Sequence, residues 1–454
     1  LRADGTSRFR KGNQWKTFPS FSLGWNVARE HFFEPLNNIV NILKFRASYG
    51  LLGNQNTTNW YQTYQTMSVG SSNGAWLMNG NKPNTASAPG LVSASLTWET
   101  IESYNLGLDW GVFNNRLTGS FDWYIRDTKN MVGNAPELPA LLGTGVPITN
   151  NTDLRTSGWE LSIGWNDRLN NGFTYGAKFN VSDARTKITR YPNNPTKAVS
   201  TYIEGRYTNE IWGYTTVGLA KTDEEMQAHL ATMPNGGQSA LGSDWKAGDI
   251  MYADINGDGK ISGGSGTLND TGDWTVIGNT TPRYLFGLDL NASWKGFDLR
   301  MFFQGVMKRD FWQGSTYLFG ASNSGMWHAT GIESVSDYFR NDDTWSVQEG
   351  YQSPNLNSYL PRPLYSNKNL QTQTRYLQSA AYIRLKNLQL GYTFPTRLTS
   401  RYGVQNLRIY FSGENLWTGT SLVDQFDPET ISGGSGGNGY PLSRTLSCGL
   451  SVTF

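Results

Sequence analysis

The segment RTLSCGLSVTF, residues 444–454, decides how the rest of the sequence is interpreted. Apolar side chains occupy every second position of this segment: Leu446, Cys448, Leu450, Val452 and Phe454. The residues between them are small or polar, and a period of two is typical of a β-strand with one apolar and one polar face. Such a strand fits either the edge of a soluble β-sandwich or a strand that crosses a membrane.

The last residue of the segment, Phe454, favours the membrane. A terminal strand that ends in Phe resembles the signal by which outer-membrane barrels are recognised for insertion, so Phe454 is predicted to act as an assembly signal. Cys448 is the single cysteine and lies on the apolar side of the strand. The sequence therefore contains no disulfide scaffold and no cysteine metal site.

The composition excludes membrane-spanning helices but not membrane-spanning strands. Hydrophobic residues make up 37% of the 454 residues, the mean hydropathy is −0.49, and no apolar run is long enough for a helix to cross a bilayer. Charged residues are 16%, below the roughly 25% of soluble proteins. A content of 13% aromatic residues and 51 Gly fits lipid-facing girdles and long polar loops. The net charge of +2 gives no reason to expect a nucleic-acid partner.

The opening residues, Leu1 to Gly5, do not have the pattern of a signal peptide. We therefore expect the signal peptide to be absent from this sequence. Two explanations are open: a cytosolic protein, or the mature or later part of a longer chain.

Segments with a period of two recur along the chain. They lie at 18–27, 43–51, 104–110, 117–125, 159–165, 173–181, 284–294, 297–303, 388–394, 407–411 and 444–454. Each has about the ten residues that a tilted barrel strand needs to cross the hydrocarbon. Asn114-Asn115, Asn170 to Gly172 and Lys295-Gly296 predict hairpin turns. The link from Pro395 to Asn406 has room for a helical turn.

The lengths of the connections favour a barrel over a sandwich. Short connections follow Val27, Trp110, Trp165, Trp294 and Phe394, whereas long ones follow Leu51, Ile125, Val181, Phe303 and Asn415. Short turns on one rim and long loops on the other are typical of outer-membrane barrels. The sequence thus predicts an all-β, transmembrane antiparallel β-barrel with about eleven strands and long extracellular loops. Open sheet edges would be costly in lipid, so further strands must close the barrel.

Several motifs, in order, resemble SusC-like TonB-dependent transporters of the SusC/RagA family. They are DGTSRF at 4–9, FPSFSLGW at 18–25, LKFRASYG at 43–50, IWGY at 211–214, KGFDL at 295–299 and YIRLKNL at 382–388. The resemblance extends over almost the whole chain, 1–454, and corresponds to the carboxy-terminal half of such a transporter.

The resemblance implies a 22-stranded outer-membrane barrel with an amino-terminal plug, a SusD-like surface lipoprotein as partner, and energy supplied through TonB. It implies import of oligosaccharides or peptides. The plug and the segment that contacts TonB are absent from this sequence. Two alternatives outside the resemblance are a passive outer-membrane porin and a secreted β-rich carbohydrate-binding protein.

The segment DINGDGKI, residues 254–261, matches the first eight positions of an EF-hand-type calcium loop. Ligand oxygens would come from Asp254, Asn256, Asp258 and the carbonyl of Lys260. Position twelve is Ser265, so the missing carboxylate would come from Asp270 or Asp273. The family pattern, in which the later Asp precedes Thr-x-Ile-Gly, favours Asp273. Structural calcium would pin the predicted extracellular loop 183–282; the alternative is a metal-free Asp/Asn/Gly turn.

Aromatic residues of the long loops are candidates for stacking on sugar rings or binding peptide side chains. They are Trp60, Tyr61, Trp312, Tyr317, Trp327 and Trp345. Packing of these residues against one another or against a lipoprotein is the alternative interpretation. On the strands, we expect Lys44, Arg46, Arg126 and Lys178 to face the lumen and to pair with carboxylates of the plug or the barrel.

No enzyme is expected. His31, His229 and His328 are far apart in the sequence, and no catalytic triad, phosphate-binding Gly loop or zinc spacing accompanies them.

Overall fold

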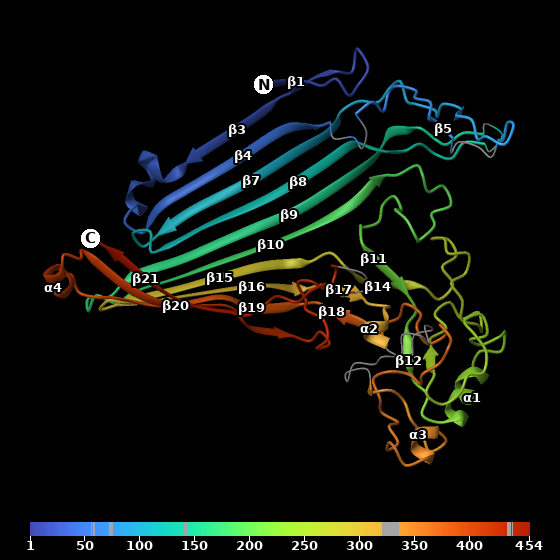
Figure 1. Ribbon diagram of the computed structural model, residues 1–454. Helices are drawn as coiled ribbons and strands as arrows, with labels where there is room; N and C mark the ends of the chain where they lie inside the picture. The colour runs from blue at the N-terminus through green and yellow to red at the C-terminus, as the bar shows by residue number, and fades with distance from the viewer. Residues whose placement is uncertain are drawn as a thin grey trace. The chain divides into compact units, whose positions relative to one another are not determined.

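The computed structural model describes residues 1–55, 57, 60–71, 76–139, 141, 143–319, 336–433, 437 and 439–454. An eleven-stranded antiparallel sheet dominates it, with the strand order β21-β20-β19-β16-β15-β10-β9-β8-β7-β4-β3 (Figure 1). Its strands are β3 Ser20–Asn26, β4 Val40–Asn54, β7 Glu99–Val112, β8 Leu117–Asn134, β9 Ile148–Arg168, β10 Thr174–Arg190, β15 Arg283–Trp294, β16 Phe297–Lys308, β19 Tyr382–Thr393, β20 Asn406–Thr420 and β21 Thr445–Thr453. The predicted all-β class and the eleven strands are confirmed.

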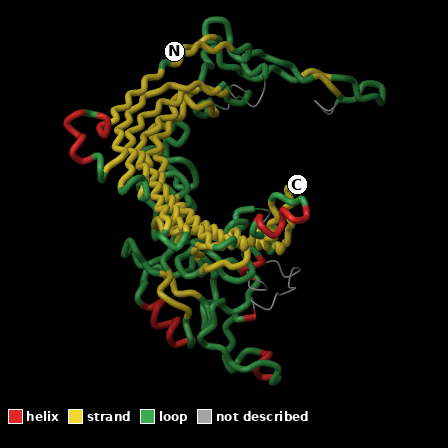
Figure 2. Tube along the Cα trace, turned by 90° about the vertical axis from the view of Figure 1, so that its left-hand side faces the viewer, coloured by secondary structure: helices red, strands yellow, loops and turns green. Residues whose placement is uncertain are grey.

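Smaller elements occupy the connections. Five two-stranded sheets pair β1 Arg2–Gly5 with β2 Trp15–Phe18, β5 Val69–Gly70 with β6 Thr85–Ala86, β11 Glu210–Gly213 with β14 Thr275–Asn279, β12 Thr216–Leu219 with β13 Ile250–Tyr252, and β17 Asp310–Trp312 with β18 Leu377–Ser379. The helices are η1 Val27–Arg29, η2 His31–Leu36, α1 Asp223–Ala231, α2 Thr316–Phe319, α3 Trp345–Gln348, α4 Thr396–Thr399 and η7 Ser400–Tyr402. They are short beside the strands (Figure 2), and no helix in the described ranges is long and apolar enough to span a membrane.

The strand register sorts side chains onto two faces of different chemistry. Leu23 pairs with Ala47 and Ala47 with Leu106, so these residues share one face, which we call the apolar face. Leu23 is 75% exposed and Leu106 is 55% exposed. Arg46 lies on the opposite, polar face and makes ion pairs there. Exposed apolar side chains on one face and ion pairs on the other are the reverse of a soluble sheet, but they suit strands that face lipid.

Hairpin turns join the strands where the sequence predicts them. Lys295 and Gly296 form a two-residue turn between β15 and β16, with φ of 48° and 92°. Asn114 and Asn115 turn β7 into β8 with φ of 57° and 60°. Positive φ at both central residues gives a turn whose twist matches that of the flanking strands, and Asn and Gly tolerate it best. The predicted helical turn between Pro395 and Asn406 is present as α4 and η7.

Some strands continue beyond the apolar segments that predict them. β8 extends to Asn134, β9 begins at Ile148, and β10 extends to Arg190. The alternating apolar pattern ends earlier because these ends need no lipid-facing side chains, but the backbone ladder continues. Some of their apolar side chains are covered by protein instead: Val132 and Ile148 pack against a buried cluster, and Ile188 is buried. The connection after Val27 is also not a tight turn. It contains η1 and η2, which bury Phe33 beside Val27.

The described residues group into two compact units, 1–114 with 120–160 and 184–208, and 115–119 with 161–183 and 209–454. The largest buried core lies in the second unit and is built from its connections. We call it the loop module. Its buried side chains come from three segments, 214–261, 318–380 and 422–431, and include Met226, Ile250, Tyr252, Ile261, Phe319, Leu360, Tyr376 and Ile431. The segment predicted as one loop, 183–282, thus contains β11 to β14 and α1.

We expect Gly296→Ala to destabilise the barrel more than Gly172→Ala does. Both glycines have positive φ, of 92° and 82°, which costs an L-residue about 1–2 kcal/mol. A Cβ on Gly296 would also lie 2.6 Å from the carbonyl oxygen of Thr393, whereas nothing lies within 4 Å at Gly172. This clash should add about 1–3 kcal/mol. The measurement is the temperature at which the full-length barrel unfolds on heating before gel electrophoresis; equal temperatures for the two variants would contradict the prediction.

Candidate functional site

The polar face of the sheet carries ion pairs that join neighbouring strands. The guanidinium of Arg46 on β4 donates to Asp109 on β7, at 2.8 and 2.9 Å, and to Asp122 on β8, at 2.8 Å. Arg300 pairs with Asp289 at 2.6 Å in the second unit. The prediction that Arg46 pairs with carboxylates of the barrel is confirmed. Charges in such numbers require water rather than lipid beside this face.

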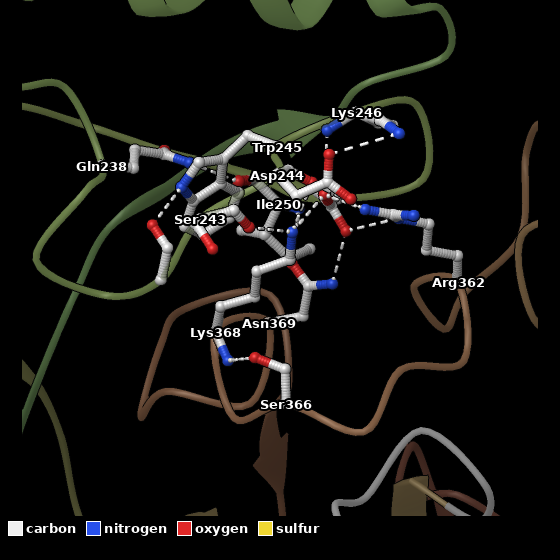
Figure 3. A network of polar contacts seen from close by, with 12 residues as sticks. Gln238, Ser243, Asp244, Trp245, Lys246, Ile250, Arg362, Ser366, Lys368 and Asn369 are labelled. Atoms are coloured by element: carbon white, nitrogen blue, oxygen red, sulfur yellow. Dashed lines mark hydrogen bonds and ion pairs between the residues drawn. The ribbon is translucent and has the colours of Figure 1, made fainter.

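One buried carboxylate, that of Asp249, links two connections of the loop module and has no solvent exposure. Arg362 donates to both of its oxygens at 2.8 Å, and Lys368 lies 2.8 Å from one of them. Asn369 donates to the same carboxylate at 2.8 Å. Figure 3 shows Lys246 on one connection and Arg362, Lys368 and Asn369 on another, converging at this junction. The carboxylate therefore joins two connections that are more than a hundred residues apart in the sequence.

The electrostatics of the junction favour a charged Asp249. Burial acts to raise the pKa of this carboxyl, but hydrogen bonds from Arg362, Asn369 and Lys368 outweigh burial, and the net pKa is below its ordinary value. The pKa of Lys368 is lowered by its own burial, against the pull of Asp249. The amine also donates to the carbonyls of Ser243 and Asp244 and lies over the Trp245 ring. All polar groups of the junction are satisfied, which is the signature of a structural joint.

The predicted calcium loop forms a compact turn in the same module. The Asp254 carboxylate accepts from the backbone N–H groups of Gly257 and Gly259, at 2.7 and 2.8 Å. Asn256 accepts from the N–H of Asp258 at 3.0 Å. Gly257 and Gly259 have φ of 73° and 79°, so the turn needs residues without a Cβ. These contacts aim side-chain oxygens toward the inside of the turn, and the carbonyl of Lys260 follows in the sequence.

Asp273 closes this turn. Its carboxylate accepts from the backbone N–H groups of Ile255 and Ser262, both at 2.8 Å, and it is fully buried. Burial raises the pKa of Asp273 despite these hydrogen bonds. Asp270 instead accepts from the N–H of Ser265 at 2.8 Å. Within the part of the chain that the structure describes, no three His, Cys, Asp or Glu side chains converge in a way that would hold a metal ion.

The aromatic residues singled out in the sequence lie in several places. Trp60 and Tyr61 belong to the first unit and are 68% and 71% exposed. In the second unit, Trp345 is 67% exposed and pairs with Tyr351 at 5.5 Å between ring centroids. Tyr317 is exposed as well. Trp327 lies outside the described residues.

Trp312 has a structural environment. Its ring packs against the loop module and lies 6.2 Å from the ring of Phe319, which is fully buried. For this residue the packing interpretation fits the observed contacts better than an open stacking surface.

Sequence reasoning missed the junction at Asp249 and a second one at Arg384. Arg384, buried on β19, donates to Asp427 at 2.6 Å and to Glu429 at 2.7 Å. Neither junction has a local motif, because the partners are distant in the sequence and each residue type is common. The only sequence signal for the second junction is that Arg384 is a charged residue between the apolar residues Ile383 and Leu385. This signal does not indicate which residues pair with Arg384.

Together, the sheet, its exposed apolar face and its ion-paired polar face define a membrane-spanning β-barrel protein. Residues 1–306 match the family described as TonB dependent receptor-like, beta-barrel, and the chain belongs to this family. The predicted SusC-like character of the chain and its predicted location in the outer membrane are confirmed by its similarity to SusC and to RagAB.

The chain is similar over its whole length to several curated TonB-dependent receptors. It is 29% identical to TonB-dependent receptor P3 of Formosa agariphila and covers 43% of that protein. It is 27% identical to TonB-dependent receptor SusC of Bacteroides thetaiotaomicron and covers 42% of it. Among solved structures, the RagAB peptide transporter matches 99% of this chain and 44% of its own, with a TM-score of 0.72 and 23% identity. The chain thus spans less than half the length of these relatives.

We expect Asp249→Asn to loosen the loop module by about 3–5 kcal/mol, because the substitution leaves the buried Lys368 and the partly buried Arg362 without a counter-charge. The measurement is hydrogen exchange at the amides of Ile250 and Tyr252, in the full-length protein. Since the folded pKa of Asp249 is below its ordinary value of 3.8, its contribution is present above pH 3.8. Protection of the same amides should therefore fall as the pH drops below 3.8.

The matched control is Asp244→Asn, because Asp244 is an exposed carboxylate that pairs with Lys246 at 3.2 Å. Its replacement should change stability by less than about 0.5 kcal/mol. Equal exchange in the two variants would show that the buried ion pairs do not hold the module.

Proposed function

We propose that the protein containing this chain imports oligosaccharides or peptides across the outer membrane as the barrel subunit of a TonB-energised transporter. The observation that carries the proposal is the two-faced sheet. Its apolar face suits lipid, and its polar face, with Arg46, Asp109 and Asp122 in ion pairs, suits a water-filled interior. Membership of the TonB-dependent receptor family supports active rather than passive passage.

Of the two substrate classes, peptides are supported by the similar proteins, whereas oligosaccharides rest on the sequence resemblance. The RagAB structures are described as a peptide transporter and a peptide importer, and their fold is shared by this chain. The similarity to SusC is spread over the whole chain. We infer that the exposed aromatic side chains Trp60, Tyr61, Tyr317 and Trp345 contact substrate or a SusD-like lipoprotein. We extend this inference to Trp327 on the sequence alone.

The loop module supports a docking role for the long connections. Its buried core and the Asp249 junction hold three connections as one body, which keeps the entropy cost of binding a partner low. A SusD-like lipoprotein would meet such a body from outside the cell. No residue described above has the geometry of a catalytic site, so the proposal does not include catalysis.

Uptake by whole cells tests the proposed function. Cells that express the full-length protein should accumulate a fluorescent oligosaccharide or peptide, and depletion of TonB should abolish the accumulation. A passive porin would continue to admit the ligand after TonB depletion. A secreted binding protein would be recovered without detergent and would support no uptake at all.

The same assay has a residue-level arm. Replacing Trp60 and Tyr61 together with Ala should raise the half-saturating ligand concentration by about 5- to 30-fold, because two rings at about 0.5–1 kcal/mol each contribute about 1–2 kcal/mol. Tyr402→Ala is the control, because Tyr402 is an 84% exposed aromatic residue beside a short connection. If the double variant and the control raise the half-saturating concentration equally, or if neither raises it, these rings are not substrate contacts.

We further propose that the turn 254–273 binds structural Ca²⁺. The donors are oxygens, the kind that a hard cation takes, and no ion pair of the buried Asp273 carboxylate is present in the described ranges. Because the aspartates of the turn do not converge in this structure, ion binding would have to draw them together. Asp254, Asn256, Asp258, Asp273 and the carbonyl of Lys260 would hold the ion. Its positive charge would offset the cost of burying Asp273 and would fix the connection between β12 and β15. The contacts of Asp273 across the turn favour it over Asp270 as the added carboxylate.

Limited proteolysis of the full-length protein, with and without a calcium chelator, tests this site. The chelator should speed cleavage within 232–274 in the wild type. The double variant Asp254→Ala with Asp258→Ala should be cleaved rapidly both with and without the chelator. Asp270→Ala should respond to the chelator like the wild type, because its carboxylate accepts hydrogen bonds from Ser265 and Gly272 rather than from residues 254–261. If the chelator does not change the digestion pattern of the wild type, the turn does not bind structural calcium.

A further inference from the structure

A cavity of about 970 Å³ lies on the apolar face of the first unit, over strands β3, β4, β7 and β8. One part of it is apolar and is lined by Phe21, Leu23, Leu106, Trp123 and Ile125. The strand register places Phe21, Leu23 and Leu106 on the apolar face, where lipid acyl chains would contact the barrel, and Trp123 and Ile125 of β8 line the same cavity. None of the functions proposed above uses this surface.

The other part of the cavity is charged. The Glu102 carboxylate accepts hydrogen bonds from the hydroxyls of Tyr49, at 3.0 Å, and Tyr104, at 2.8 Å. The amine of Lys129 donates to the same carboxylate at 2.5 Å. Glu102 is largely shielded, with 15% of its side chain exposed, whereas Lys129 is 48% exposed.

A second ion pair lies beside the first. Arg155 donates through Nε and Nη2 to the two oxygens of Asp127, both at 2.7 Å. The Asp127 side chain is 9% exposed and that of Arg155 is 52% exposed. In both pairs the carboxylate is covered and the cation is accessible. Lys129 and Arg155 also keep N–H donors that these contacts do not use.

The position of the charges along the strands explains why they are tolerated on this face. Lys129 lies twelve residues after Leu117 on β8, which corresponds to about 40 Å along the strand, or about 30 Å in height at a barrel tilt of 35–45°. The apolar band of such barrels is about 25 Å tall and starts near the short turns on the periplasmic side. Lys129 therefore lies at the outer border of the hydrocarbon, where a cation on the lipid face costs about 0–1 kcal/mol.

We propose that this cavity binds the phosphorylated headgroup of an outer-leaflet glycolipid. Lys129 and Arg155 would donate to the phosphate, and the acyl chains would lie against Leu23, Leu106 and Trp123. The two parts of the cavity match the two parts of such a lipid. The accessible cations suit the anionic headgroup, and the apolar side chains suit the hydrocarbon. Glu102 and Asp127 fix the two cations in place and are not themselves available to an anion.

The test uses the full-length protein, purified from the outer membrane in mild detergent and studied by native mass spectrometry. The probes are lipid A that carries phosphate and the same lipid A after phosphatase treatment. The wild-type protein should bind the phosphorylated probe at least about 10-fold more tightly, since charge-assisted hydrogen bonds to phosphate are lost with the second probe. Equal binding of the two probes would overturn the proposal without the need for any variant.

Variants locate the site. Glu102→Gln with Lys129→Gln, combined with Asp127→Asn and Arg155→Gln, removes both ion pairs but keeps the net charge and leaves polar side chains at all four positions. This variant should lose the preference for phosphate. The control, Asp289→Asn with Arg300→Gln, removes an ion pair of the polar face and should keep the preference.

Retention of the preference in the first variant would overturn the assignment to this cavity. A change of oligomeric state with the preference intact would instead identify the cavity as an interface between copies, and would also overturn it. Resistance to heat before electrophoresis verifies that each variant is folded.

Discussion

Backbone hydrogen bonding inside the bilayer is the constraint on which the rest of this structure depends. Lipid offers no partner to an N–H or C=O group, so each strand that crosses it must be paired with its neighbours. The ladder that satisfies this requirement also fixes the register. From the register follows which side chains share a face, for example Leu23, Ala47 and Leu106 on one side and Arg46 on the other.

Charge is handled differently in each environment of the chain. On the polar face, Arg46 pairs with two carboxylates in a partly exposed network. The desolvation cost of these ion pairs is small, because water still solvates part of each charged group. In the loop module, Asp249 is fully buried, so every lone pair has to be matched by a donor. On the apolar face, charges are confined to the border of the hydrocarbon, where Glu102 and Asp127 lie beneath their cations. The surroundings, more than the residue types, decide what each carboxylate does.

The sequence predicts the sheet well because membrane strands display their environment in a period of two. The hairpins at Asn114-Asn115 and Lys295-Gly296 follow from turn residues that tolerate positive φ. The ends of β8, β9 and β10 carry no such pattern, so their extent was not predictable. The motif at 254–261 predicts a tight turn, because Asp and Asn side chains accept hydrogen bonds from nearby backbone N–H groups and Gly tolerates positive φ. The junction of Asp249 with Arg362 and Lys368 depends on contacts distant in the sequence, and no local rule indicates it.

The shared core of the loop module restricts how this protein can change over evolution. Side chains from 214–261, 318–380 and 422–431 are buried against one another, so each segment completes the packing of the other two. Replacing one of them by the corresponding loop of a relative would leave cavities and clashes in the remaining pair. The three segments must therefore be inherited, or recombined, as a block, while lipid-facing positions of the strands are constrained mainly to remain apolar. New surface specificities would then be acquired by transfer of the whole block onto a conserved barrel.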